Sequence, residues 1–354
     1  MNLPIPAAAD RGGRALLLLA CFVVLIAGMK AAAALLQPFL IAVFITMVSL
    51  PMLNWLRKYM HPALAMLLTV GADLLVLGAV IVLVGGSIQA FIDAVPRYEA
   101  ILRQRADDII TLLQNYGIEV SRDQAREWID PGQLFGWVTS SMRGAVAVLS
   151  NAVLVFLASV FMLAEVAGFP AKLERAFGRS GRSSARFRHI QLEIQRYLSV
   201  KTAVSLATGI LVGLAMWAIG IDFPVLWGLL AFVLNYIPTL GSIFASIPPI
   251  MLAIVQFEGL GPALAVAAVF LSVNLLLGSF LEPQLLGRRL GISTLVVFAS
   301  VIFWGWVWPP VGMLVSVPMT MVVKIMLENT EDLRWVAVLL DANPRKKDRK
   351  LGTA

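Results

Sequence analysis

Two strings, Asn235-Tyr-Ile-Pro-Thr-Leu-Gly-Ser242 and Trp304-Gly-Trp-Val-Trp-Pro-Pro-Val-Gly312, decide the expected architecture of this chain. Each lies inside an apolar segment and places a proline three residues before a glycine, as Pro238-x-x-Gly241 and Pro309-x-x-Gly312. Proline removes a backbone donor and clashes with the preceding helical turn, while glycine tolerates the bend that results. The sequence therefore predicts two apolar segments that are each broken near the midpoint.

The length of these segments favours a hairpin at each break. They span residues 224–257 and 293–326. As one helix, either would measure roughly 50 Å, against a membrane hydrocarbon core of about 30 Å. Broken in the middle, each gives two limbs too short to cross alone, as expected of a re-entrant hairpin that lines protein or a cavity. Paired, interrupted segments of this kind are typical of the substrate site of a transporter.

The composition is that of a polytopic membrane protein, with 59% hydrophobic and 14% charged residues among 354. The single cysteine, Cys21, excludes a disulfide framework, and the distant histidines His61 and His189 give no His-based metal site. The sequence has no hydrolase or nucleotide-binding motif, which argues against an enzyme or an ATP-driven pump. No cofactor is expected. The net charge of +7 lies mostly in loops, where it reports topology rather than affinity for nucleic acid.

Alternating apolar and polar stretches predict an all-α fold with about eight hydrophobic segments. In order, the regions are a cytoplasmic tail (1–14), three spans (15–92), an extracytoplasmic loop of amphipathic helices (93–142), a fourth span (143–167), a basic cytoplasmic arm (168–201), a transport core (202–326) and a basic cytoplasmic tail (327–354). The polar middle of the arm, residues 179–186, is expected to be a flexible turn.

The positive-inside rule orients the molecule. Basic residues gather in the first tail, after the second span and in the arm, whereas the 93–142 loop is rich in acids. We therefore expect both termini in the cytoplasm. A single crossing by residues 224–257 would leave Arg288 and Arg289 outside, while a hairpin returns them to the cytoplasm, which is the arrangement we prefer. The two hairpins then form an inverted pair, entered from opposite faces.

Residues at and near the breaks are the candidates for binding a substrate or gating its path. They are Asn235, Pro238, Thr239, Gly241, Ser242, Asn274, Pro309, Pro310 and Gly312. Neutral donors and acceptors suit a small polyol-like ligand, and carbonyls freed at a broken helix suit a cation. For Asn274, which lies mid-span, hydrogen bonding between helices is an alternative with equal weight.

Four charged residues are candidates for an ion pair or for coupling to an ion: Glu282, Arg288, Arg289 and Asp73. Glu282 either pairs with an arginine, which is the interpretation we prefer, or carries a proton- or sodium-linked charge. Asp73 lies deeper in an apolar segment, where an ionisable group costs a few kcal/mol or more. A functional role and packing against a water or hydroxyl partner both stay open for it.

Several strings resemble the autoinducer-2 exporter family, also described as PerM-like permeases. They are YLSVKT at 197–202, LNYIPTLGS at 234–242, LEPQLLGRRLG at 281–291, and FWGWVW at 303–308 with VGM at 311–313. The resemblance is specific from about residue 194 to 326 and architectural before that. The family commonly has Gly where Pro309 stands and Asn where Ser279 stands, so a stiffer second break is expected here.

The resemblance implies an integral protein of the bacterial inner membrane that contacts lipid and forms a homo-oligomer, with pentamers known in the family. It also implies a secondary transporter that exports a small polar solute such as the signal autoinducer-2, with sodium (or another cation)–proton exchange as the alternative. A channel and a non-transporting scaffold are two further classes, since re-entrant loops line pores too. For a transporter, the hairpins would be the gates, and residues 202–326 would move as a unit against residues 15–166.

Overall fold

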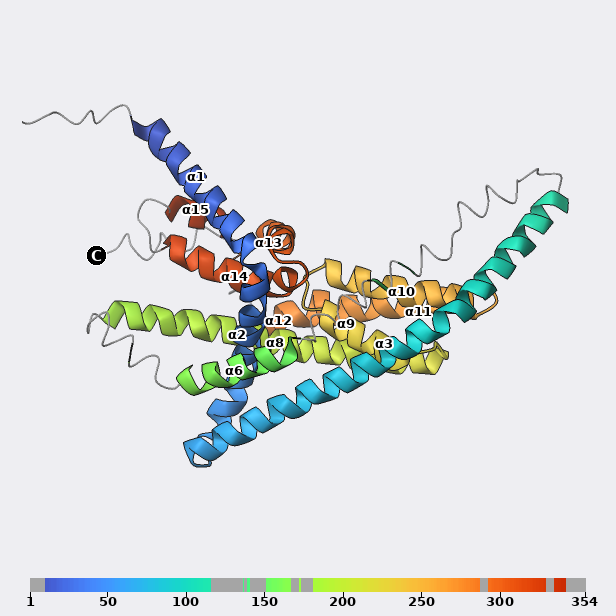
Figure 1. Cartoon of the computed structure of the whole chain (residues 1–354), viewed down its shortest axis with the longest axis horizontal. Helices are drawn as coiled ribbons and strands as arrows, with labels where there is room; N and C mark the ends of the chain where they lie inside the picture. Colours follow the sequence, from blue (N-terminus) through green and yellow to red (C-terminus); the bar gives the residue numbers. More distant parts are fainter. Residues whose placement is uncertain are drawn as a thin grey trace, which may run out of the picture.

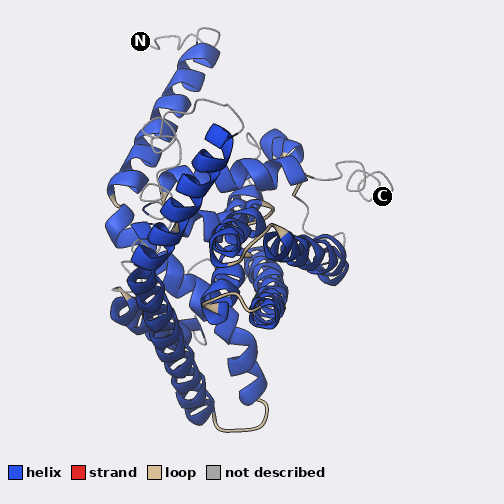
Figure 2. Ribbon diagram, turned by 90° about the vertical axis from the view of Figure 1, so that its right-hand side faces the viewer, coloured by secondary structure: helices blue, strands red, loops and turns tan. Residues whose placement is uncertain are grey.

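The computed structural model describes residues 10–115, 136, 139–140, 151–166, 172, 181–286, 292–328 and 334–341. The elements of this part of the chain are helices (Figures 1 and 2). They are α1 (Asp10–Ala31), α2 (Ala33–Leu56), α3 (Pro62–Asn115), α6 (Ala152–Val166), α8 (Gly181–Ile219), α9 (Pro224–Leu234), α10 (Leu240–Gln256), α11 (Gly261–Val273), η1 (Asn274–Leu281), α12 (Glu282–Leu286), α13 (Thr294–Val307), α14 (Val311–Glu328) and α15 (Arg334–Leu339).

Five stretches of helix are long and apolar enough to cross a membrane. They are Ala33–Leu56, Pro62–Arg105, Gln191–Ile219, Gly261–Leu286 and Val311–Glu328. Shorter apolar helices accompany them, including both limbs of the first broken segment. Such a chain has to form helices, because in lipid each backbone polar group must find its partner inside the protein. The predicted all-helical class is confirmed for the described residues.

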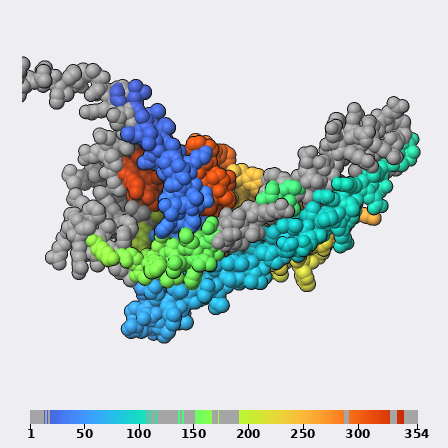
Figure 3. Space-filling model, in the orientation of Figure 1, coloured from blue at the N-terminus to red at the C-terminus, as the bar shows by residue number. Residues whose placement is uncertain are grey.

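Helix α3 continues past the expected end of the third span. It runs without interruption through residue 92 to Asn115, and at 1.5 Å per residue it is about 80 Å long (Figures 1 and 3). Its second half contributes Ile88, Phe91 and Tyr98 to an apolar core shared with α8, α9, α10 and α11. The start of the expected 93–142 loop is therefore a rigid extension of a long apolar helix.

Helix α8 also crosses an expected boundary, because it runs through residue 201 without a joint. Most of the expected flexible turn, from Gly181 to Arg186, is helical. Residues 179–180, and the candidates Arg288 and Arg289, lie outside the described residues. From Gly181 onward, the arm is one continuous helix.

The first broken segment turns back on itself. Helices α9 and α10 are separated by residues 235–239, and Thr239 in this break has a φ of 61°. Gln256, at the end of α10, accepts a hydrogen bond from the backbone N–H of Asp222 and donates one to the carbonyl of Gly220. Both outer ends of the pair therefore lie beside the C-terminal end of α8.

The second broken segment has the same form. Helices α13 and α14 are separated by residues 308–310. The N–H of Ser293, before α13, donates to the carbonyl of Leu340, and Lys324 near the end of α14 lies 3.5 Å from Asp341. The pair shares an apolar cluster with residues 194–198 of α8. The outer ends of the α13–α14 pair therefore meet beside α15. This pair packs against the N-terminal half of α8, whereas the α9–α10 pair packs against the C-terminal half.

A glycine closes each break by backbone contact. A Cβ added at Gly241 would lie 1.8 Å from the carbonyl oxygen of Leu234, and one at Gly312 would lie 1.9 Å from that of Trp304. No side chain fits at either place. The glycine of each Pro-x-x-Gly string is thus a steric requirement of the turn between the limbs.

The packing crosses the expected division between residues 15–166 and 202–326. The second half of α3 packs with α8 to α11, as described above. Conversely, Trp304 and Trp308 of the second pair pack against α1 and α2, and the indole N–H of Trp308 donates to the carbonyl of Met29. The structure therefore groups the second half of α3 with the first hairpin, and α1 and α2 with the second.

Candidate functional site

A polar face on α8 forms the centre of the candidate site. Lys201, Ser205 and Thr208 recur at spacings of four and three residues, which places them on one side of the helix. They are almost fully buried, with 3%, 0% and 7% of their surface exposed. Buried polar groups need hydrogen-bond partners. The partner of Ser205 comes from the first break, and that of Lys201 comes from α12.

The first break is attached to this face by two side-chain hydrogen bonds. The amide nitrogen of Asn235 donates to Oγ of Ser205 at 2.9 Å, and the hydroxyl of Tyr236 donates to Oγ1 of Thr202 at 2.8 Å. Asn235 and Tyr236 are each 6% exposed. The predicted candidate Asn235 therefore lies in the interior, where its amide joins the break to α8.

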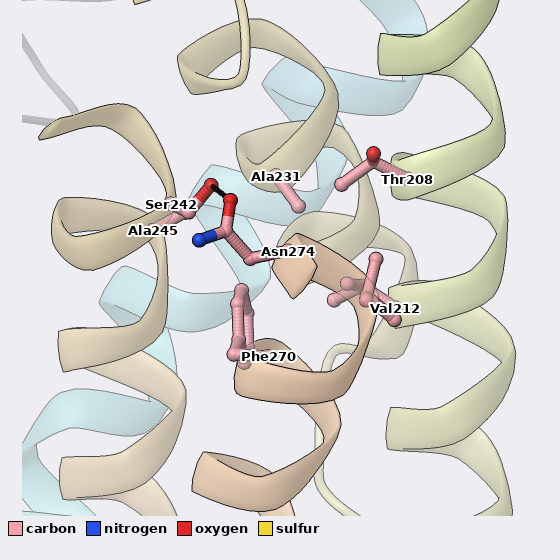
Figure 4. Close-up of a pocket in the computed structure, with 8 residues that line it drawn as sticks. Thr208, Val212, Ala231, Ser242, Ala245, Phe270 and Asn274 are labelled. Carbon is pink, nitrogen blue, oxygen red and sulfur yellow. Dashed lines mark hydrogen bonds between the residues drawn. The ribbon is translucent and has the colours of Figure 1, made fainter. Parts of the chain in front are cut away.

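A small pocket lies beside this contact, and Figure 4 shows its lining. Ser242 of α10 donates its hydroxyl to the amide oxygen of Asn274 at 2.9 Å, while Thr208 of α8 lies on the opposite wall. The cavity volume is about 10 Å3, roughly the room that one water molecule needs, and the other lining residues are apolar. A larger solute therefore requires the helices around this pocket to separate.

The backbone next to this pocket is unusual. Asn274 is the first residue of η1, a π-helix that runs to Leu281. The i→i+5 bonding of a π-helix is rare and is found frequently at functional sites. Here it separates the mid-span Asn274 from Glu282, the first residue of α12.

Glu282 is paired, but with a different residue from those expected. Nζ of Lys201 lies 2.8 and 2.9 Å from the two carboxylate oxygens of Glu282, and the two side chains are 4% and 15% exposed. The pair joins α8 to α12 across 81 positions of sequence. Ion pairing was the preferred interpretation of Glu282, and the structure supplies a lysine on the polar face of α8 as its partner.

The other predicted break residues do not join this site. Thr239 is exposed, and its hydroxyl donates to the carbonyl of Pro238, its own neighbour. Pro309, Pro310 and Gly312 belong to the second break, which packs near α1 and α2. The side-chain hydrogen bonds that hold the first break go to α8, whereas the second break packs near α1 and α2.

Helix α2 touches both breaks. Phe44 packs edge-to-face on Tyr236 with ring centroids 5.2 Å apart, and the side-chain amide of Gln37 donates to the carbonyl of Pro309 at 3.5 Å. Phe44 and Gln37 are seven positions apart, about 10 Å along a helix. Helix α2 is therefore a direct physical connection between the two breaks.

Asp73 lies in a different environment, between α2 and α3. Its Oδ1 accepts a hydrogen bond of 2.7 Å from Ser49 of α2, and its Oδ2 is buried without a hydrogen-bond partner among the described residues. A hydroxyl partner was one of the two alternatives for this carboxyl group.

The α8 residues and Tyr236 were not identified from the sequence as candidate site residues. The missed residues are Lys201, Thr202, Ser205, Thr208 and Tyr236. The signal that could have identified most of them is the recurrence of polar residues at helical spacing inside an otherwise apolar segment. Their partners could not have been read from spacing, because each lies at least 30 positions away.

Comparison with known proteins identifies the family. A model described as "AI-2E family transporter" matches residues 19–332. The chain belongs to the AI-2E transporter family. It is 37% identical to the AI-2 transport protein TqsA of Escherichia coli (strain K12) over 332 residues, covering 93% of this chain and 96% of TqsA. It is 34% identical to YhhT of the same strain over 354 residues, covering 99% of this chain and 100% of YhhT.

Membership of the AI-2E family establishes the class of this protein. It is a multi-pass membrane protein of a bacterial transporter family and not an enzyme. A third relative, from Haemophilus influenzae, is 35% identical over 334 residues and covers similar shares of both chains. The resemblance noted from the motifs is thereby confirmed over nearly the whole length.

Proposed function

We propose that this protein is a secondary transporter that exports a small, uncharged, hydroxylated solute of the autoinducer-2 type across the bacterial inner membrane. The observation that carries the proposal is the set of neutral donors and acceptors between α8, α10 and η1. Thr208, Ser242 and Asn274 line the pocket, and the Asn235–Ser205 hydrogen bond lies next to it. Hydroxyl and amide groups can donate and accept, so they match the hydroxyls of a polyol-like solute. The 37% identity to a protein named for AI-2 transport supports the same substrate class.

The hairpin geometry supports alternating access. Both ends of the α9–α10 pair lie beside the C-terminal end of α8, and the α13–α14 pair packs at the other end. Two re-entrant hairpins entered from opposite membrane faces would have this relation. With the basic arm inside, the first hairpin opens outward, the second opens to the cytoplasm, and both termini are cytoplasmic. This inverted pair is the arrangement of gates that alternating access needs.

The moving units proposed here follow the packing. One unit contains α9 to α11 with the second half of α3, and the other contains α13 and α14 with α1 and α2. Helix α8 contributes to both units, because its residues 194–198 pack with the second and its residues 212–216 with the first. Opening the contact between Tyr236 and Phe44 would separate the first gate from α2.

A second candidate function is cation–proton exchange, and a specific observation favours it. Asp73 holds a buried carboxylate oxygen without a partner among the described residues, which is a suitable place for a transported or coupled ion. This activity and solute export are compatible, because the ion could drive the solute.

Association of several copies is proposed as well. Within one chain, only 6% of the most apolar stretch of α3 is buried. Lipid or a second copy must therefore cover the rest of it. We propose a homo-oligomer, with the pentamer of the family as the expected size. Native mass spectrometry of the purified protein in detergent measures the number of copies, and a monomeric species alone would contradict the proposal.

Flux in reconstituted vesicles tests the transport function. We expect saturable uptake of the autoinducer-2 signal into inside-out vesicles by the wild type and at least a tenfold loss in the double variant Asn235→Ala/Ser242→Ala. The matched control is Ser246→Ala, whose hydroxyl bonds only to its own helix at Ile243. Non-saturating electrogenic flux would instead indicate a channel, and absence of flux for any tested solute or cation would indicate a scaffold.

A further inference from the structure

The carboxyl group of Asp73 lies near the middle of a membrane-spanning helix. It is about 16 Å along α3 from Pro62, which is about half of a 30 Å hydrocarbon core. Ser49 of α2 donates to its Oδ1 at 2.7 Å, and Oδ2 is buried with no partner among the described residues. The group thus has one hydrogen bond where an ionised carboxylate accepts several.

Three further hydroxyl groups lie buried on the helices that pack around this position. They belong to Thr46 of α2, Thr69 of α3 and Ser159 of α6, which are 2%, 0% and 0% exposed. Each donates its proton to a main-chain carbonyl of its own helix. Because a hydroxyl oxygen also has two acceptor sites, these groups can accept a hydrogen bond but bring no positive charge. The same three helices share an apolar cluster that contains Leu50, Leu53, Leu56, Ala65 and Leu163.

No cation among the described residues compensates Asp73. Helices α2, α9 and α10, which pack against α3, contain no charged residue within their bounds. Arg57, the residue that follows α2, lies eight positions from Ser49, about 12 Å along the helix. Helix α6 has only Glu165, which lies 2.5 Å from Lys172. The next charged residue along α3 is Asp93, about 30 Å away on the helix. An ionised carboxylate buried without a counter-ion is far less favourable than a neutral carboxyl group at the same place.

We propose that Asp73 is the proton-binding site of this transporter. Its carboxyl group carries a proton on Oδ2 in the resting protein and releases it to water when the α2–α3 contact opens. Release breaks one O–H bond, transfers the proton to a water molecule and leaves a carboxylate that attracts further water between the helices. The resting protonation stands on the cluster alone, and the release during transport rests on the proposed function.

Helix α2 connects this site to the substrate region. It carries Ser49, which bonds Asp73, and Phe44, which packs on Tyr236 of the first break. Tyr236 in turn donates to Thr202 on the polar face of α8. A shift of α2 on deprotonation would therefore act directly on the contact that holds the first gate. Proton movement and gate opening share one rigid element.

Infrared difference spectroscopy of the purified full-length protein tests the resting state. At near-neutral pH, the difference spectrum of wild type minus Asp73→Asn should contain the carbonyl band of a protonated carboxylic acid. The control Glu282→Gln should retain that band, because Glu282 faces Lys201 as an ion pair. Carboxylate bands in place of the carbonyl band would overturn the proposal. Carboxylate bands that respond to Na+ would overturn it in favour of a cation site.

A measurement on the wild type removes any dependence on folding of the variant. An apolar carbodiimide reacts with protonated carboxyl groups in apolar surroundings, and peptide mass spectrometry should locate its adduct on Asp73. Adducts at exposed acids only would contradict the proposal. Neither measurement needs a substrate. If the carbonyl band is present but the vesicles show no flux, the transport function is contradicted and the proton site is not. If flux occurs but the carbonyl band is missing, the proton site is contradicted and the transport function is not.

Discussion

Gly241 and Gly312 lie where the two limbs of a broken segment meet backbone to backbone. The distances from an added Cβ to a carbonyl oxygen, 1.8 and 1.9 Å, are far inside any van der Waals contact. Proline starts each break by removing a donor, and glycine allows it to close. The contacts that require glycine lie within the turn itself. The turn can therefore be recognised in the sequence from the short Pro-x-x-Gly spacing.

Alanine at either glycine should therefore open the turn. We expect Gly241→Ala and Gly312→Ala each to lower the free energy of unfolding by about 1–3 kcal/mol, the usual cost of overpacking, and to abolish transport. Thermal melting and vesicle flux measure the two effects. Gly261→Ala is the matched control, because no atom lies within 4 Å of its added Cβ. Wild-type melting and flux in Gly241→Ala would show that the turn is not required.

The pair Lys201–Glu282 is the most buried ion pair among the described residues. Removing one partner leaves the other charge buried and unpaired, at a cost of about 3–5 kcal/mol, whereas removing both charges is often neutral. We expect Glu282→Gln and Lys201→Met to melt at clearly lower temperature than wild type. The double variant should recover most of that loss.

Flux separates the structural role of this pair from a role in coupling. If the double variant recovers stability but not transport, the charges take part in the transport cycle. Recovery of both would assign the pair to structure alone. Equal melting of wild type and Glu282→Gln would contradict the burial of the pair.

At the scale of elements, α3 braces the first hairpin. Arg105 donates to the carbonyls of Ile254 and Phe257 at 2.6 and 2.8 Å, and Tyr98 donates to Asp222 at 2.5 Å. The last carbonyls of a helix have no hydrogen-bond partner in their own helix, and the guanidinium group of Arg105 supplies one. Its positive charge also interacts favourably with the negative end of the helix dipole. The extension of α3 beyond the third span thus acts as a clamp on α10.

Removal of the clamp should loosen the end of α10. We expect Arg105→Ala to increase the rate of hydrogen exchange at residues 253–257 by about tenfold, which corresponds to loss of about 1.4 kcal/mol of local stability. Arg103→Ala, at an exposed position of the same helix, is the control and should leave those rates unchanged. Unchanged exchange in Arg105→Ala would mean that α10 holds this end without α3.

At the scale of the molecule, the helices pack as two groups joined by α8 and α2. Phe44 and Tyr236 face one another across the groups, with ring centroids 5.2 Å apart, while Phe91 and Trp227 lie within one group at 5.6 Å. The two aromatic contacts have similar geometry and differ in whether alternating access would separate them.

Cysteine pairs at these positions test the motion in a Cys21→Ser background. A short thiol-reactive bridge between positions 44 and 236 should stop transport, and cleavage of the bridge should restore it. The same bridge between positions 91 and 227 should leave at least half of the flux. Full flux through a protein bridged at 44 and 236 would rule out the proposed separation and favour a fixed channel.

The sequence by itself determined the class and the places where helices break. Apolar composition over whole segments demands helices, and the Pro-x-x-Gly spacing marks the turns, because both effects act within a few residues. Hydropathy was a poor guide to where helices end. Helix α3 continues after its apolar character fades, and α8 passes through the basic arm. The backbone hydrogen bonds of a helix do not depend on the polarity of its side chains, so a helix can continue where the apolar stretch ends.

Only the tertiary structure decided the partners. Lys201 meets Glu282, Asn235 meets Ser205 and Ser49 meets Asp73 across 81, 30 and 24 positions of sequence. Which buried polar groups meet depends on how each helix is rotated and which helix it packs on. Those choices follow from the summed packing of many apolar side chains rather than from any local motif. The grouping of each hairpin with its own supporting helices has the same origin.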